Sequence, residues 1–271
     1  MAKSKHYYIR KLHRYLGLVL GIQFLFWTLG GLYFSWNNID EVHGDHLRQQ
    51  KHYLPPNVYL ASPQLAIQEL KGRTPVDSIK AIQLIEILGT PTYQIHYFTK
   101  DEGATPGTQQ SESHGGGHSE VSSRVQLALA GTGRLRSPLS EEEAVRIARN
   151  SVVEPSQIEK AEYLTAVGAH HEYREKPLPA WAVTFSQPAC TVYISAEQGT
   201  FQAIRHNQWR AFDFLWMLHT MDFQSRDNFG NFLLKAFSIL GLITVLSGFA
   251  LYFVSSSFVR KARKQAGAHR I

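Results

Sequence analysis

Two apolar runs frame the chain and are the clearest pattern in its sequence. Residues 15–36 and residues 236–259 contain no Asp, Glu, Lys or Arg. A helix of about 20 apolar residues crosses the roughly 30 Å hydrocarbon core of a bilayer. The pattern therefore predicts two transmembrane helices, at 11–36 and 231–257. The first run is too long for a signal peptide and is followed by no small-residue cleavage site, so we interpret it as an uncleaved anchor.

A repeated pattern fills the stretch between the two runs. A short amphipathic helix is followed by three strand-like segments and a glycine turn, and the whole unit occurs twice. The first helix opens at Ser62 and the second at Ser140, where Ser-Glu-Glu-Glu is a capping-box start. The repeat assigns one unit to residues 57–136, with a mobile insertion at 100–124 that is rich in Gly, Ser and Thr, and a second unit to residues 137–206.

The predicted fold class is an α+β membrane protein, in which two transmembrane helices flank an extracytoplasmic domain of two helix-plus-three-strand units. The remaining predicted segments are a basic tail at 1–10, a linker at 37–56, an interfacial aromatic segment at 207–230 and a second basic tail at 258–271.

The charge distribution sets the expected topology. Residues 1–14 carry five Lys or Arg and no acid, and residues 255–271 carry five more, again without an acid. Without these ten, 18 basic residues stand against 22 acidic ones. Lys and Arg accumulate on the cytoplasmic side of membrane helices. We therefore expect both termini in the cytoplasm, the bilayer as the partner of both runs, and no nucleic-acid partner despite the net charge of +6.

Several classes of chemistry are missing from the sequence. The single cysteine, Cys190, excludes an intramolecular disulfide and a cysteine-held cluster within the chain. There is no nucleophile motif, no phosphate loop, no pair of carboxylates with acid–base spacing and no dinucleotide fingerprint after a strand. These absences argue against a hydrolase and against a nicotinamide or flavin dehydrogenase.

His13 lies just before the first apolar run, and Gly17 and Gly21 follow it one and two helical turns later. The three residues form one stripe on a helix, and small residues let another helix or a flat ligand approach the backbone. His219 lies in the aromatic segment before the second run. Each histidine is either an interfacial anchor or a ligand. The topology places them at opposite faces of the bilayer, about 30 Å apart.

Two further groups of histidines are candidate metal or haem ligands. His43 and His46 follow the first run, and His114 and His118 lie in the insertion. Together they are a candidate Cu²⁺ or Zn²⁺ site, although the three glycines between His114 and His118 argue against the helix that this spacing needs. His43 or His46 is also a candidate for the second axial ligand opposite His219.

The motifs at both ends resemble those of the PepSY-associated transmembrane family. Residues 13–17 (His-Arg-Tyr-Leu-Gly) are similar to its opening motif. Residues 218–220 (Leu-His-Thr), Gly230 and residues 246–249 (Leu-Ser-Gly-Phe) are similar to its closing element, except that Met221 stands where the family usually has Gly. Between them, residues 139–148, 179–185 and 193–199 resemble a PepSY domain.

The resemblance implies a function. Relatives with four transmembrane helices include inner-membrane ferric-siderophore reductases, which carry b-type haems between helices and move electrons outward. It implies that His13 and His219 ligate haem b iron, and that Arg14 pairs with a propionate beside Gly17 and Gly21. This chain has two helices, so a complete haem core requires a homodimer or a hetero-oligomeric complex. In a parallel dimer, His13 meets His13 and His219 meets His219.

Two functions follow as expectations. The first is a haem-binding electron-transfer protein or reductase subunit of the bacterial inner membrane, passing electrons to an extracytoplasmic acceptor such as a ferric chelate. Such a chain would belong to a haem-dependent membrane oxidoreductase. The second is a non-enzymatic, membrane-anchored interaction or accessory subunit, in which the helices serve only as anchors.

Overall fold

The computed structural model describes residues 5–49, 53–100, 121–155, 157–226 and 228–255. These residues form two compact units. A helical unit contains the chain up to Asn38 and from Ala211 onward, and an α+β domain contains Ile39–Arg210. The expected fold class is confirmed, with two long apolar helices and two sheets.

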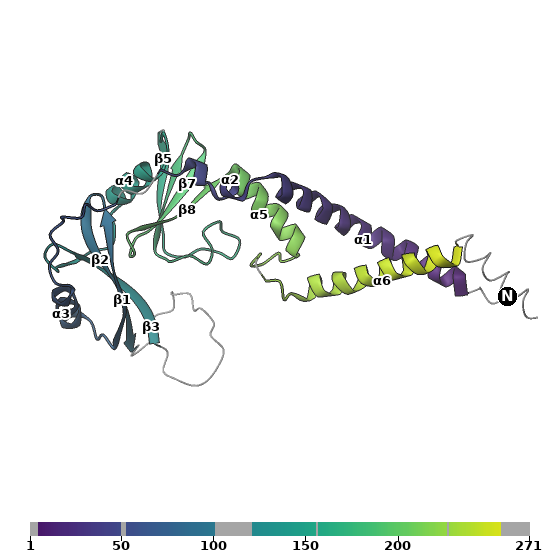
Figure 1. Ribbon diagram of the computed structural model, residues 1–271, viewed down its shortest axis with the longest axis horizontal. Helices are drawn as coiled ribbons and strands as arrows, with labels where there is room; N and C mark the ends of the chain where they lie inside the picture. Colours follow the sequence, from purple (N-terminus) through teal and green to yellow (C-terminus); the bar gives the residue numbers. More distant parts are fainter. Residues whose placement is uncertain (1–4, 50–52, 101–120, 156, 227, 256–271) are drawn as a thin grey trace, which may run out of the picture. The chain divides into compact units, whose positions relative to one another are not determined.

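The helical unit is built on α1 (Lys5–Trp36) and α6 (Phe232–Ser255), which pack against each other (Figure 1). The contact is made by small residues of α6: a Cβ placed on Gly241 would lie 3.2 Å from the Phe24 ring. Leu20 of α1 and Thr244 of α6 are buried at this contact face. Small residues permit close helix approach, which is the usual basis of helix packing in a bilayer.

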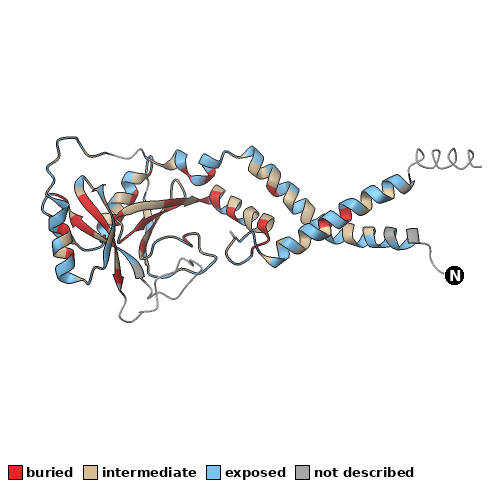
Figure 2. Ribbon diagram, turned by 60° about the horizontal axis from the view of Figure 1, so that its bottom comes forward, coloured by how far each residue is buried: buried red, intermediate tan, exposed pale blue. Residues whose placement is uncertain are grey.

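Most other residues of the two spans are exposed or half-buried, and nearly all of them are apolar (Figure 2). The two apolar spans are Arg10–Trp36 and Phe232–Phe253. In the most apolar 18-residue stretch of each span, only 11% is buried. Leu18 and Ile22 of α1 and Leu242 of α6 are each at least 59% exposed. The core helix of a water-soluble protein would bury such side chains, so this surface requires a lipid environment.

The α+β domain contains two antiparallel four-stranded sheets, with strand orders β1-β2-β3-β4 and β5-β6-β7-β8. The first sheet comprises β1 (Ser78–Ile87), β2 (Thr90–Lys100), β3 (Val121–Leu129) and β4 (Leu135–Arg136), preceded by α3 (Pro63–Arg73). The second comprises β5 (Ile158–Leu164), β6 (Ala180–Phe185), β7 (Cys190–Ser195) and β8 (Thr200–His206), preceded by α4 (Glu141–Ser151).

Local sequence explains how each half begins. The Ser140 hydroxyl accepts from the Glu143 N–H, and the Glu143 carboxylate accepts from the Ser140 N–H, which completes the expected capping box. Ser62 caps α3 in the same position, with Pro63 as the first helical residue. Ala144 and Ala148 lie four residues apart, and therefore on one side of α4. Both side chains are fully buried, so this is the side of the helix that faces the sheet.

One core joins the two sheets. Ile87 and Leu127 from the first sheet pack with Val183, Val192 and Ile204 from the second. The Gln94 side chain donates a 2.7 Å hydrogen bond to the Gln198 carbonyl across the same junction. Every residue of β7 is buried, because the shared core covers one face and a second cluster around Tyr173 covers the other. The two repeats therefore form one domain.

The structure adds three features that the repeat pattern did not predict. Each sheet has a fourth strand, β4 and β8, in place of the expected three. Part of the predicted linker folds onto the domain as α2 (Ile39–His43) and the short helix η1 (Asp45–Leu47), and Arg48 pairs with Val152. Strands β2 and β3 extend into both ends of the predicted insertion, whose centre lies outside the described residues.

Candidate functional site

His13 lies on the α6-facing side of α1. Its Nδ1 is 2.8 Å from the Ser247 hydroxyl of α6. The backbone of Gly248 passes beside the ring, since a Cβ at that position would lie 3.4 Å from His13 Cε1. The Ser247 hydroxyl also donates to the Thr244 carbonyl at 2.7 Å. The histidine is therefore held by a polar contact between the helices, within an otherwise apolar surface.

Gly17 and Gly21, the other residues of the predicted stripe, face open space. A Cβ placed on Gly17 or Gly21 would meet nothing within 4 Å. Arg14 is exposed, and its guanidinium lies 5.5 Å from the Tyr15 ring centroid. The structure thus brings His13 to α6 and leaves Gly17 and Gly21 uncovered by the described part of the chain.

His219 lies in α5 (Asn207–Thr220), within a group of aromatic rings from α1 and α5. The ring centroids of Trp27, Phe34 and Trp216 lie 6.0, 5.8 and 6.2 Å from that of His219, and Trp216 is stacked on it. Its Nδ1 is buried and has no hydrogen-bond partner among the described residues. An unpaired buried nitrogen is uncommon in proteins and calls for an explanation.

Two side chains of α1 donate hydrogen bonds to the last residues of α5. Trp27 Nε1 donates to the His219 carbonyl at 2.9 Å, and Gln23 Nε2 donates to the Leu218 carbonyl at 3.1 Å. The last carbonyls of a helix lack partners within it. Gln23 and Trp27 satisfy two of them and so position His219. A glutamine inside an apolar run indicates a side chain that faces protein, but its partner, and the role of Trp27, depend on how α5 packs against α1.

The two histidines lie at opposite ends of the helical unit. His219 contacts α1 at Gly30, whereas His13 lies 17 residues earlier on the same helix. At 1.5 Å per residue this corresponds to about 25 Å along the helix axis. The two imidazoles of one chain therefore cannot bind the same iron ion.

His43 and His46 belong to the α+β domain, in α2 and η1. The His46 ring is 5.5 Å from that of His206, whose Nε2 lies 3.0 Å from the Glu41 carbonyl. Burial lowers the pKa of His206. Among the described residues no three His, Cys, Asp or Glu side chains gather as a metal site. His114 and His118 of the proposed Cu²⁺ or Zn²⁺ cluster lie outside these residues.

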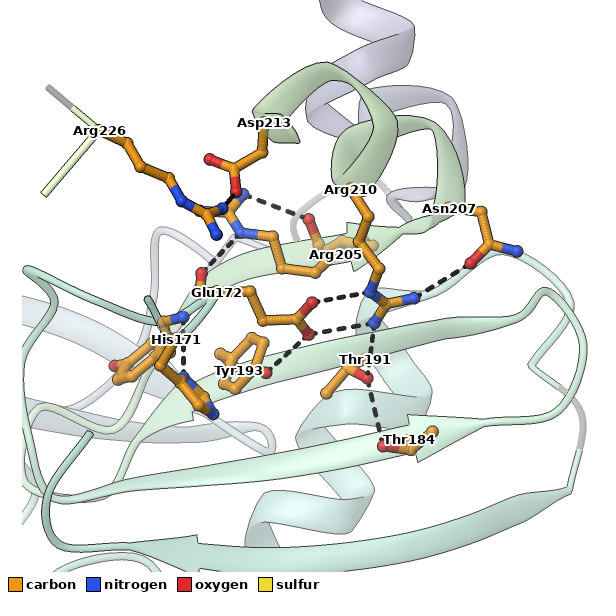
Figure 3. A network of polar contacts seen from close by, with 12 residues as sticks. His171, Glu172, Thr184, Thr191, Tyr193, Arg205, Asn207, Arg210, Asp213 and Arg226 are labelled. Atoms are coloured by element: carbon orange, nitrogen blue, oxygen red, sulfur yellow. Dashed lines mark hydrogen bonds and ion pairs between the residues drawn. The ribbon is translucent and has the colours of Figure 1, made fainter. Parts of the chain in front are cut away.

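A polar network surrounds the start of α5 (Figure 3). Arg210 donates to both carboxylate oxygens of Glu172, at 2.8 and 3.1 Å, and the Tyr193 hydroxyl donates to one of them at 2.8 Å. Arg205 donates to the Glu172 carbonyl and lies 4.0 Å from the Trp209 ring centroid. Glu172 is 21 or more residues away along the chain from Tyr193, Arg205 and Arg210, so no local pattern could have predicted its hydrogen bonds.

The network determines the charge states of its members. Burial would raise the pKa of Glu172, but the hydrogen bonds from Arg210 and Tyr193 and the charges of Arg210 and Arg205 outweigh it and lower the pKa. Burial lowers the pKa of Arg205 to about 10. The carboxylate thus stays ionised and ties the loop before β6 to the first turn of α5.

The family model of the PepSY-associated TM region matches residues 10–271. This chain belongs to the PepSY-associated transmembrane family. No curated protein and no solved structure matches it at a significant level. The chain is accordingly a membrane protein with a PepSY domain, as its motifs indicated.

One residue at the end of α5, Met221, departs from the motif of the PepSY-associated transmembrane family and has an unusual backbone conformation. Met221, which stands where the family usually has Gly, has a φ of +53°. Glycine adopts that conformation without the clash that a side chain causes. The Met221 side chain is 4% exposed, so its burial offsets part of the strain. A glycine would suit the sharp turn that ends α5 two residues after His219.

Asp222 organises the turn that follows. Its carboxylate accepts from the Ser225 hydroxyl and from the backbone N–H groups of Gln224, Ser225 and Asn228. Burial would raise the pKa of Asp222, but these hydrogen bonds lower it from 3.8 to about 2. Asn231 links the same turn to α6 by donating to the Thr220 carbonyl and accepting from the Leu234 N–H.

We expect this turn to lose stability in acid. Because the folded-state pKa of Asp222 is depressed, its contribution is complete above its ordinary value of 3.8 and is lost as the pH falls to about 2. Urea midpoints of the purified wild type and Asp222→Asn should differ at pH 6 and converge near pH 2. Glu159→Gln, at an exposed strand position, is the control. An equal difference at both pH values would contradict this account.

Proposed function

We propose that this protein is a haem-binding electron-transfer protein of the bacterial cytoplasmic membrane. One observation carries the proposal. His13 and His219 lie at the two ends of the same helical unit, and each has a ring nitrogen that no described residue hydrogen-bonds: Nε2 of His13 and Nδ1 of His219. A neutral imidazole is the usual axial ligand of b-type haem iron.

The residues around His13 fit haem b. Gly17 and Gly21 leave the surface of α1 open where a porphyrin would lie against it. Arg14 is the nearest cation in sequence and suits a propionate carboxylate. At the other end, the rings of Trp27, Phe34 and Trp216 give His219 an apolar surrounding that suits a porphyrin.

Assembly supplies the missing ligands. Because about 25 Å separates the two histidines along α1, a haem held by one of them would need any further protein ligand from another chain or from another part of this chain. A parallel two-fold homodimer pairs His13 with His13 and His219 with His219. A hetero-oligomeric complex in which a partner contributes the ligands is the other arrangement.

The mechanism follows from the placement of the residues. When bound, haem b supplies a one-electron Fe(III)/Fe(II) couple. His13 and His219 would hold haem at the two ends of the helical unit, and the apolar faces of α1 and α6 would exclude water from both ends. The lysines and arginines of both tails support cytoplasmic termini and an extracytoplasmic PepSY domain. Electrons would then move outward to an acceptor such as a ferric chelate.

The visible spectrum of the purified protein tests the proposal. We expect a reduced b-type spectrum and one haem per chain, with a dimeric or hetero-oligomeric mass in detergent. A folded, correctly assembled protein without haem would overturn the proposal. That colourless outcome is what the alternative function, a non-enzymatic membrane-anchored interaction subunit, predicts.

A further inference from the structure

The contact between His13 and Ser247 determines where the imidazole carries its proton. The Ser247 hydroxyl oxygen lies 2.7 Å from the Thr244 carbonyl oxygen and 2.8 Å from His13 Nδ1. A hydroxyl group has one proton, and a carbonyl oxygen has none. The contact with Thr244 is therefore a hydrogen bond only if Ser247 donates its proton there.

Ser247 is then left to accept from His13. If the serine proton points at Thr244, the contact at Nδ1 is a hydrogen bond only when Nδ1 carries a proton. This is the single assignment in which both short contacts are hydrogen bonds. In a neutral imidazole with a proton on Nδ1, Nε2 has the free lone pair.

We propose that Ser247 is a positioning residue, which fixes His13 as the Nδ1–H tautomer and presents Nε2 as the ligand atom. The assignment of Nε2 to haem iron rests on the proposed function, whereas the tautomer does not. Ser247 acts through His13 and touches no ligand itself. Histidine ligands commonly donate their second N–H to a neighbouring acceptor, which orients the ring and raises its basicity.

The position of Ser247 in α6 suits this role. The Thr244 carbonyl precedes it by three residues, so the helix backbone itself directs the hydroxyl proton away from His13. Gly248 next to it lets the histidine ring approach the α6 backbone. The acceptor is a neutral hydroxyl rather than a carboxylate, which avoids an ionised group inside the membrane span.

A matched pair of serine variants tests the role. Ser238 also donates to a carbonyl of its own helix, that of Leu234 at 2.8 Å, but it hydrogen-bonds to no histidine among the described residues. In a His219→Ala background, which retains only the haem at His13, Ser247→Ala should weaken haem binding by about 10- to 100-fold. It should also raise the midpoint potential, because a less basic ligand stabilises Fe(III) less. Ser238→Ala should change neither value.

Rescue separates this role from a merely structural one. Ser247→Thr retains the hydroxyl and should restore both affinity and potential. Alanine is a better helix former than serine, so Ser247→Ala should leave α6 intact. If Ser247→Ala binds haem with wild-type affinity and potential, the proposal is wrong. The same conclusion follows if Ser238→Ala has an equal effect.

A second measurement keeps the two proposals distinct. If the wild type carries no haem, the proposed function fails, and ¹⁵N NMR of the same preparation still reads the tautomer. The His13 signal is assigned by its absence in His13→Ala. We expect a protonated Nδ1 in the wild type and in Ser238→Ala, and a mixture of tautomers in Ser247→Ala. A wild-type His13 protonated on Nε2 would overturn the positioning role.

Discussion

His13→Ala should halve the haem content of the purified protein, and His13→Ala combined with His219→Ala should abolish it. The two sites are about 25 Å apart along α1, so loss of one imidazole leaves the other site intact. Alanine offers no nitrogen to the iron, and the Ser247 hydroxyl facing this position is a poor replacement ligand. The haem-to-chain ratio, measured from the reduced pyridine complex of the extracted haem, gives the result directly.

A matched histidine variant serves as the control. His170 is exposed on the α+β domain, and no hydrogen bond of its side chain is present among the described residues. His170→Ala should keep the full haem content and the wild-type oligomeric mass. Undiminished haem in His13→Ala, with the same spectrum, would show that His13 is an interfacial anchor and not a ligand.

Gly133→Ala should cause a large loss of stability in the α+β domain. Gly133 has a φ of +76°, and a Cβ there would lie 2.7 Å from Leu65 Cβ and 3.2 Å from the Ala66 nitrogen. A side chain at positive φ costs about 1–2 kcal/mol. Overpacking against α3 adds about 1–3 kcal/mol. The expected decrease in the free energy of unfolding is thus about 2–5 kcal/mol, measurable by pulse proteolysis in urea.

The same turn contains its own control. Gly131 lies two residues earlier, is exposed, has no positive φ and would place a Cβ in open space. Gly131→Ala should therefore change the urea midpoint little. Equal losses in the two variants would mean that the turn tolerates no side chain anywhere, and that contact with α3 is not the cause.

Much of the architecture follows from short-range patterns. The two apolar runs predicted both long helices because membrane spans are defined by length and hydropathy. The Ser140 capping box predicted the start of α4 because its hydrogen bonds connect residues three apart. The motifs around His13 and His219 indicated the family, which the match over residues 10–271 confirmed.

Strand number and the linker were predicted less well. The β4 strand has only two residues, and β8 comes directly after the glycine turn that was expected to end the strands of the second unit. The predicted linker contains α2, whose Val42 is buried against the domain. Such short elements exist because the shared core covers them, and periodicity alone has too few residues to reveal them.

The sequence by itself determined that two helices cross the membrane, that a repeated α+β domain lies between them, and that His13 and His219 are the candidate ligands. Only the tertiary structure decided how these two histidines are held. Ser247 is 234 residues from His13 along the chain, and Trp27 is 192 residues from His219. Contacts over such separations depend on how helices pack, and packing depends on the whole chain, which no local pattern records.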